Sequence, residues 1–128
     1  MPRGELEMTA SISQLHEQAM DAAENALLMR RRGNHRAAEI EFRRAYELER
    51  QAAFQLFPVH DAEPTRGVLF RSAATLALDV GELEAAEALA AAGLAGLNVS
   101  AGVQAELRAV LEDVKQRRVC RRCASRRP

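Results

Sequence analysis

Two cysteines near the end of the chain form the arrangement with the clearest chemical potential. Cys120 and Cys123 are separated by Arg121 and Arg122, and two thiolates at this spacing can supply half of a tetrahedral zinc site. The other half is missing, because the chain contains no further cysteine. We therefore expect no bound metal or other cofactor, and cysteines that are incidental to a mobile tail. Metal-bridged pairing of two chains, and a disulfide or redox role, stay open as alternatives.

Histidine and serine occur without the neighbours that catalysis requires. His16-Glu17 begins like the zinc-protease pattern, but the second histidine would stand at position 20, where the chain has Met20. No glycine-rich loop is spaced to hold phosphate, and no strand–turn–helix segment frames a serine nucleophile. The sequence therefore predicts that the protein is not an enzyme and has no catalytic residues.

The charges of the chain are divided unevenly along its length. Acidic and basic residues number 18 each, so the formal net charge is zero. All 18 acidic residues lie at or before Asp113, whereas Lys115 and six arginines follow it. A basic end of this kind can dock on nucleic acid or on another anionic surface. The interpretation we favour is a short solvated tail that folds back on the acidic body.

Apolar residues recur every three or four positions through most of the chain, which is typical of amphipathic helices. No segment alternates apolar and polar residues as a half-buried strand does. The pattern predicts an all-α protein with helices over residues 11–32, 34–56, 64–80, 83–97 and 101–118. Residues 1–9 are expected to be a flexible N-terminus, 10–118 a single helical-repeat domain, and 119–128 a basic tail. Glu49 and the other charged residues of the second helix are expected on its solvated faces.

Two helical hairpins share the same order of small residues. In each, a glycine that ends one helix is followed at five, nine and twelve positions by residues on one face of the next helix. Small side chains on such a face let a neighbouring helix approach closely. We therefore expect helix-packing positions at Gly33, Ala38, Phe42, Ala45, Gly81, Ala86, Ala90 and Gly93.

This order of residues resembles the tetratricopeptide repeat, a helical hairpin that stacks into arrays. Ala38, Phe42 and Ala45 occupy the family's small and aromatic positions, whereas the second hairpin departs from the family at its last two positions. The two glycines are 48 residues apart, against a family period of 34. Residues 63–74 are also similar to a stretch of small bacterial tetratricopeptide-like proteins of undefined role. The resemblance implies a stack of antiparallel helical hairpins followed by a basic C-terminal tail.

In that family the first helix of each hairpin lines a concave face that holds a partner. Arginines on such a face can bind a partner's carboxylate in a two-point fit. We expect Arg31 to be an ordinary solvated charge at a helix end, and leave Arg71 open between the two roles. The resemblance implies a groove lined by Ala23, Leu27, Arg30, Arg71, Thr75 and Asp79.

The leading hypothesis is a non-enzymatic adaptor that binds a protein or peptide in this helical groove. The alternative is a nucleic-acid-associated or metal-bridged assembly factor acting through the basic tail, with nucleic acid as the less favoured partner. Association of two copies is a further alternative, through Val103, Leu107 and Leu111 if the last helix is uncovered. No apolar run is long enough for a membrane span, and no secretory signal is evident at the N-terminus. A cytoplasmic location is therefore expected.

Overall fold

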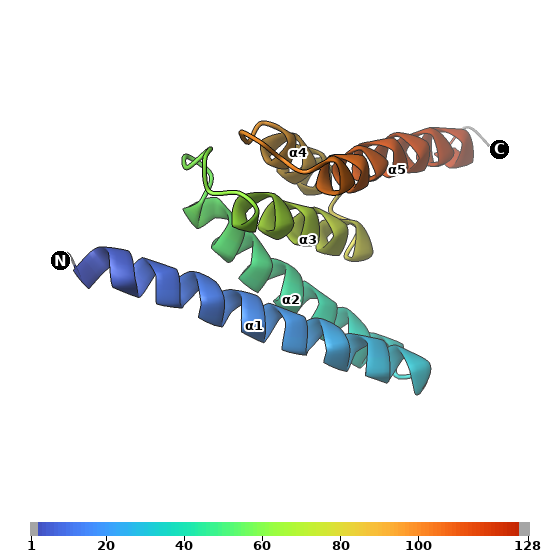
Figure 1. The fold of residues 1–128 in the computed structure, drawn as a ribbon. Helices are drawn as coiled ribbons and strands as arrows, with labels where there is room; N and C mark the ends of the chain where they lie inside the picture. The colour runs from blue at the N-terminus through green and yellow to red at the C-terminus, as the bar shows by residue number, and fades with distance from the viewer. Residues whose placement is uncertain (1–2, 126–128) are drawn as a thin grey trace.

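The backbone of residues 3–125 and the side chains of residues 11–123 are described in a computed structural model. Five α-helices follow one another (Figure 1): α1 (Arg3–Arg31), α2 (His35–Gln55), α3 (Thr65–Asp79), α4 (Leu83–Leu94) and α5 (Ala101–Ser125). Residues 3–125 contain no strand. The all-α class and the five helices expected from the sequence are therefore confirmed.

Several helix ends lie away from their expected positions. α1 begins at Arg3 rather than near Ser11, and α5 continues beyond Arg118 to Ser125. Both extensions contain leucine, methionine, alanine or arginine, which favour helix. α4 ends at Leu94 instead of near residue 97. The rest of the expected flexible N-terminus and basic tail, residues 1–2 and 126–128, lies outside the described residues.

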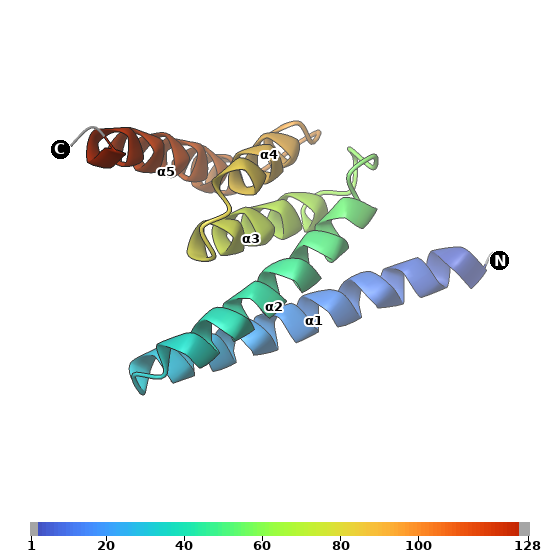
Figure 2. The ribbon, with the colours of Figure 1, turned by 180° about the vertical axis from the view of Figure 1, so that it is seen from behind.

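The helices form two antiparallel hairpins and a single last helix. α1 packs on α2, and α3 packs on α4, while α2 contacts α3 and so joins the hairpins. α5 packs on both α3 and α4. In Figure 1, α1, α3 and α5 follow one another across the face toward the viewer, and α2 and α4 come forward in the reverse view of Figure 2. This arrangement is a helical stack with α1, α3 and α5 on one side.

The hairpin turns depend on two glycines for a conformational reason. Gly33 and Gly81 both have φ of 80°, in the left-handed region that side chains disfavour. A Cβ atom at either position would meet nothing within 4 Å. These glycines therefore set the backbone direction at the turns and make no close packing contact. After the first turn, the side chain of Asn34 accepts the backbone N–H of Ala37 at 3.4 Å and caps α2.

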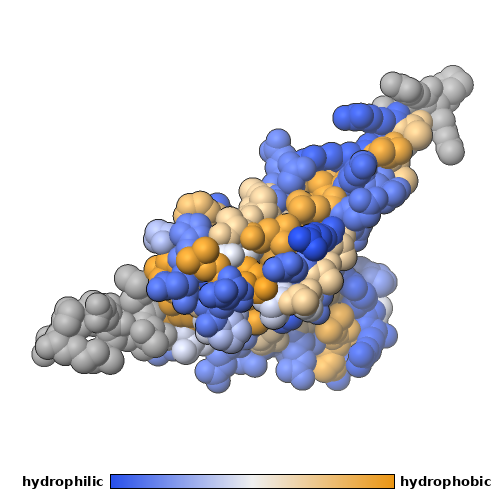
Figure 3. All heavy atoms as spheres, turned by 45° about the horizontal axis from the view of Figure 1, so that its top comes forward, coloured by the Kyte–Doolittle hydropathy of each residue, from blue (hydrophilic) through white to orange (hydrophobic). Residues whose placement is uncertain are grey.

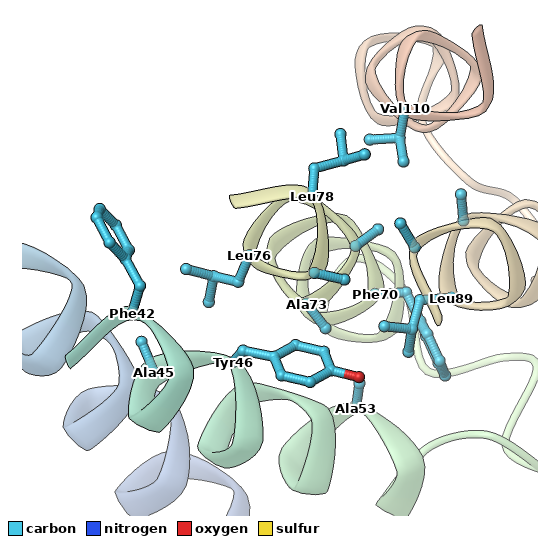
Figure 4. Close-up of a cluster of buried hydrophobic side chains, with 14 of the residues drawn as sticks. Phe42, Ala45, Tyr46, Ala53, Phe70, Ala73, Leu76, Leu78, Leu89 and Val110 are labelled. Carbon is cyan, nitrogen blue, oxygen red and sulfur yellow. The ribbon is translucent and has the colours of Figure 1, made fainter. Parts of the chain in front are cut away.

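The core between the helices is built largely from alanine. Figure 4 shows side chains from α2, α3, α4 and α5 meeting in one cluster, with Leu78 of α3 pointing toward Val110 of α5. Because many of these side chains are short, the helix backbones lie close together. The expected packing positions Ala38, Phe42, Ala45, Ala86, Ala90 and Gly93 are all buried.

α4 lies very close to its neighbours at Gly93. A Cβ atom there would lie 2.9 Å from Cδ1 of Leu107 and 3.0 Å from Cβ of Phe70. Leu107 and Phe70 are both 0% exposed. Gly93 therefore lets α3, α4 and α5 meet at one point, which fixes α5 on the second hairpin.

A buried arginine joins the carboxyl ends of two helices. Arg66, in the first turn of α3, is 0% exposed. Its Nε and Nη2 atoms donate to the carbonyls of Leu56 and Phe57, each at 3.0 Å, just beyond α2. Its Nη1 atom donates to the carbonyl of Ala92 in α4 at 2.8 Å. The carbonyls of Leu56 and Ala92 also accept the backbone N–H groups of Val59 and Ala95, whereas within residues 3–125 that of Phe57 has its donor from Arg66 alone. The guanidinium thereby fixes α3 against the ends of α2 and α4.

The last helix is covered where it was expected to offer a contact for a second copy. Leu107 is 0% exposed, and Val103 and Leu111 are partly buried against the core. The packing of α3 and α4 on α5 accounts for this burial. Leu107 is therefore not accessible to a second copy, whereas association through the partly buried Val103 and Leu111 stays a prediction.

Candidate functional site

α1 has one side packed on α2 and a second side that stays open beside α3. Ala19, Ala22 and Ala26 on the packed side are buried. Met20 and Leu27 on the open side are 36% and 45% exposed. The residues of the open side recur every three or four positions and are Ile12, His16, Met20, Ala23, Leu27 and Arg30.

Two hollows lie near opposite ends of α1 and α3, the first between these two helices and the second over the first turns of α2. The first has a volume of about 240 Å³ and is mainly apolar, with Ile12 and His16 of α1 facing Thr65 and Val68 of α3. The second, which we call the turn pocket, has a volume of about 250 Å³. It is lined by Arg30, His35, Ala38, Glu39, Phe42, Asp79 and Val80. We call the surface between the two hollows the α1–α3 face.

A third hollow, of about 320 Å³, lies between α3 and α5. Thr75 and Leu78 line one side, and Glu106, Val110 and Asp113 line the other. α1, α3 and α5 therefore present two adjoining concave surfaces on the same side of the molecule. With the top of the Figure 1 view turned forward, hydrophobic residues reach the surface in patches among hydrophilic ones (Figure 3).

The groove residues expected from the sequence are distributed over these surfaces. Ala23 is half-buried and Leu27 is exposed on α1. The structure brings Arg30 and Asp79 together in the turn pocket. Thr75 is exposed beside α5, and its hydroxyl donates to the carbonyl of Arg71 in its own helix at 2.9 Å.

Arg71 is engaged with an acidic side chain of the same molecule. Its Nη1 atom lies 3.0 Å from Oε2 of Glu106 on α5. It also attracts the buried carboxylate of Glu49. A partner's carboxylate would have to replace Glu106 to reach this guanidinium. The position at which Arg71 could bind a partner's carboxylate is therefore already taken by Glu106.

A buried carboxylate lies beneath the α1–α3 face. Glu49 of α2 is 0% exposed, and Nδ1 of His16 lies 3.0 and 2.9 Å from its two carboxylate oxygens. Burial raises the pKa of Glu49, against opposing effects of His16, Ser72 and Arg71. The expectation that Glu49 lies on a solvated face is therefore wrong, because α1 and α3 cover this side of α2. The spacing of the sequence does indicate this burial, because Glu49 lies four residues after Ala45 and three before Ala52, which are both buried in α2.

No protein-family model, curated protein or solved structure matches the chain. Over residues 3–125, the chain is a small all-helical protein with five helices. Within residues 3–125, no helix is both long and apolar enough to span a membrane.

Two arginines at the basic end of α5 pair with acidic side chains. Nη1 of Arg118 lies 2.8 Å from Oε2 of Glu87 in α4. Arg117 pairs with Asp113 at 2.9 Å and also donates to the carbonyl of Leu78 at 2.9 Å. Arg121 and Arg122 face the same acidic side of α4, across a hollow of about 650 Å³. These arginines lie on the continuous helix α5, so as far as Ser125 the chain does not form the loose solvated tail that was expected.

Cys120 and Cys123 are exposed thiols one turn apart on α5. Among the described residues, no group of three or more histidine, cysteine, aspartate or glutamate side chains could hold a metal ion. A zinc site built on this pair would need ligands from another molecule.

Proposed function

We propose that the protein is a non-enzymatic adaptor with tetratricopeptide-like architecture, which binds an extended segment of a protein partner on its α1–α3 face. The observation that carries the proposal is the open side of α1, where Met20 and Leu27 are 36% and 45% exposed beside α3. Exposed apolar side chains that follow a concave surface are typical of binding grooves.

The dimensions of this face suit a short peptide. From Ile12 to Arg30, α1 rises about 27 Å at 1.5 Å per residue. An extended chain covers that distance with about eight residues. The hollows at the two ends, of about 240 and 250 Å³, are each large enough for one side chain of such a segment.

The hairpin geometry supports the tetratricopeptide-like part of the proposal. Both hairpins turn at a left-handed glycine, Gly33 or Gly81, and both second helices bury their small residues. α1 and α3 are the first helices of their hairpins, which is where repeat proteins of this kind bind partners.

The tail-based alternative has less support. The described arginines Arg117 and Arg118 already contact acidic or carbonyl oxygens of the body. Nucleic acid would have to compete with these contacts, and metal-bridged assembly would rest on Cys120 and Cys123 alone.

Partner capture with a matched pair of variants tests the proposal. Leu27→Glu places a charge on the α1–α3 face. Ile40→Glu makes a similar change on α2, outside this face, where the Ile40 side chain is 62% exposed. Both positions are exposed, so both variants should fold. A partner captured by the wild type is purified, and its Kd is measured with each protein.

We expect the Kd to rise at least tenfold for Leu27→Glu and to stay unchanged for Ile40→Glu. Burying a new charge in a contact costs well over the 1.4 kcal/mol that a tenfold change represents. Equal loss of binding in both variants, or no loss in Leu27→Glu, would contradict the proposed surface.

A further inference from the structure

The turn pocket contains more acidic than basic groups, and these groups are not paired with one another. Asp79 and Glu39 are carboxylates, Arg30 is the single permanent cation in the lining, and His35 completes the set of titratable groups. In the described part of the chain, none of these four side chains has an ion pair within 4.0 Å or a side-chain hydrogen bond. The pocket therefore offers two exposed carboxylates that no side chain of the described residues engages.

Arg30 is held away from full pairing by an aromatic ring. Its guanidinium carbon lies 4.4 Å from the centroid of the Phe42 ring, an arrangement that is stabilising in itself. Phe42 is only 5% exposed and fixed in the core, so the guanidinium has a defined position at the wall of the pocket. Arg30 attracts Asp79 from there but donates no hydrogen bond to it.

The other cation near Asp79 is also engaged elsewhere. Arg117 of α5 contacts the carboxylate of Asp113 at 2.9 Å and the carbonyl of Leu78 at 2.9 Å. Surrounding protein atoms withdraw water from Asp79 and raise its pKa, and the attraction of Arg30 and Arg117 only partly opposes this effect. Asp79 nonetheless remains exposed, and no side chain of the described residues donates a hydrogen bond to its carboxylate.

We propose that the turn pocket binds one cationic side chain, lysine or arginine, of the partner segment that lies on the α1–α3 face. The inference rests on the proposed function for the identity of the occupant, because Arg30 and Asp79 stand at the end of that face. An ammonium or guanidinium group would donate charge-assisted hydrogen bonds to Asp79 and Glu39.

Charge and size both favour this occupant. With His35 neutral, the lining groups sum to one negative charge, so a carboxylate ligand would be repelled by Asp79 and Glu39 even though Arg30 attracts it. The volume of about 250 Å³ equals roughly eight water molecules at about 30 Å³ each, below the range of drug-sized ligand sites. That is room for one side chain.

A titration with blocked amino acids tests the pocket without needing the natural partner. N-acetyl-arginine amide, N-acetyl-lysine amide and N-acetyl-glutamate amide are added separately to ¹⁵N-labelled protein, and amide chemical shifts are followed. We expect the two cationic probes to shift the amides of Ala38 and Val80, which line the pocket, and the glutamate probe to leave them unchanged. The stronger of the two cationic probes identifies the preferred headgroup.

Two matched substitutions assign the binding to the carboxylate. Asp79→Asn removes the charge with almost no change of shape, and Asp61→Asn makes the same change at an exposed residue of the connector between α2 and α3. We expect Asp79→Asn to weaken the cationic probe at least fivefold and Asp61→Asn to leave its Kd unchanged. Glu39→Gln provides a second pocket variant, with weakening in the same direction.

Three results would overturn the inference: no shift at Ala38 or Val80 with either cationic probe, equal shifts with the glutamate probe, or equal binding by wild type and Asp79→Asn. Because the probes are single amino acids, these outcomes are independent of partner capture. A pocket that takes no cation would leave the proposed adaptor function standing, and loss of that function would not change the probe titration.

Discussion

Replacing Gly93 with alanine separates two opposing effects on stability. Alanine favours helix over glycine by about 1 kcal/mol, so the substitution alone would stabilise α4. The new Cβ atom, however, would lie 2.9 Å from Leu107 Cδ1 and 3.0 Å from Phe70 Cβ, inside ordinary van der Waals contact. Both neighbours are fully buried, and the Cβ atom of Phe70 moves only with its backbone. Overpacking of this kind costs about 1–3 kcal/mol.

Gly102 provides the matched control. It lies in the first turn of α5, and a Cβ atom there would meet nothing within 4 Å. Gly102→Ala therefore carries the helix-propensity gain without the clash, and we expect it to be neutral or stabilising by up to about 1 kcal/mol. The difference between the two variants should equal the overpacking cost at Gly93, about 1–3 kcal/mol.

Urea unfolding followed by circular dichroism measures both free energies of unfolding. We expect Gly93→Ala to be less stable than Gly102→Ala by at least about 1 kcal/mol, or roughly 3–5 °C in Tm for a chain of this size. A Gly93→Ala variant as stable as Gly102→Ala would show that the helices do not meet at this point, and the reasoning on close packing would fail.

Three further predictions concern buried charges and the turns. Arg66→Met should lower the free energy of unfolding by about 1–3 kcal/mol in urea titrations, because the carbonyl of Phe57 loses its donor and those of Leu56 and Ala92 keep only a backbone donor. Arg66→Lys should recover little of this loss, since an ammonium cannot match the guanidinium fork. Burial raises the pKa of Glu49, so the unfolded chain loses this proton first as pH rises above about 4.5. The wild type should therefore lose stability relative to Glu49→Gln until the pH passes the folded pKa. Urea midpoints of both proteins between about pH 4 and pH 8 measure the difference, and parallel curves would contradict the raised pKa. Gly81→Ala should cost about 1–2 kcal/mol of unfolding free energy because φ is 80° there, and Gly81→Asn should cost less.

The helices and turns could be predicted because their signals are local. Gly33 and Gly81 end their helices through backbone conformation, and Asn34 caps through a contact three residues away. Apolar spacing then places residues such as Phe42 and Ala45 in the core. Each of these assignments depends on residues within one or two helical turns, which is the distance over which sequence patterns carry information.

The buried charged residues could not be identified in the same way. Glu49 and Arg66 stand in the buried registers of α2 and α3, but a charged residue at a single such position is ordinarily exposed. Their burial depends on partners distant in sequence, His16 for Glu49 and the end of α4 for Arg66. The sequence indicates the burial of Arg66 only through its position, since Arg66 precedes the buried Phe70 and Ala73 at helical spacing.

The candidate site shows the same limit. The sequence places Arg30 and Asp79 on the first helices of their hairpins, and the resemblance assigns both to one groove. Their meeting in a pocket with Phe42 and Glu39 depends on how the second hairpin docks on the first. The pairing of Arg71 with Glu106 likewise depends on the position of α5, which no local pattern specifies.

The most direct test of the account is a map of the partner-binding surface on the labelled protein. Amide chemical shifts are recorded with and without the purified partner segment. We predict changes along α1 and α3, including Met20, Leu27 and Val68, with unchanged signals at Ile40 of α2 and Ala88 of α4, both exposed outside this face. Changes confined to α2 and α4, or to the basic end of α5, would contradict this prediction.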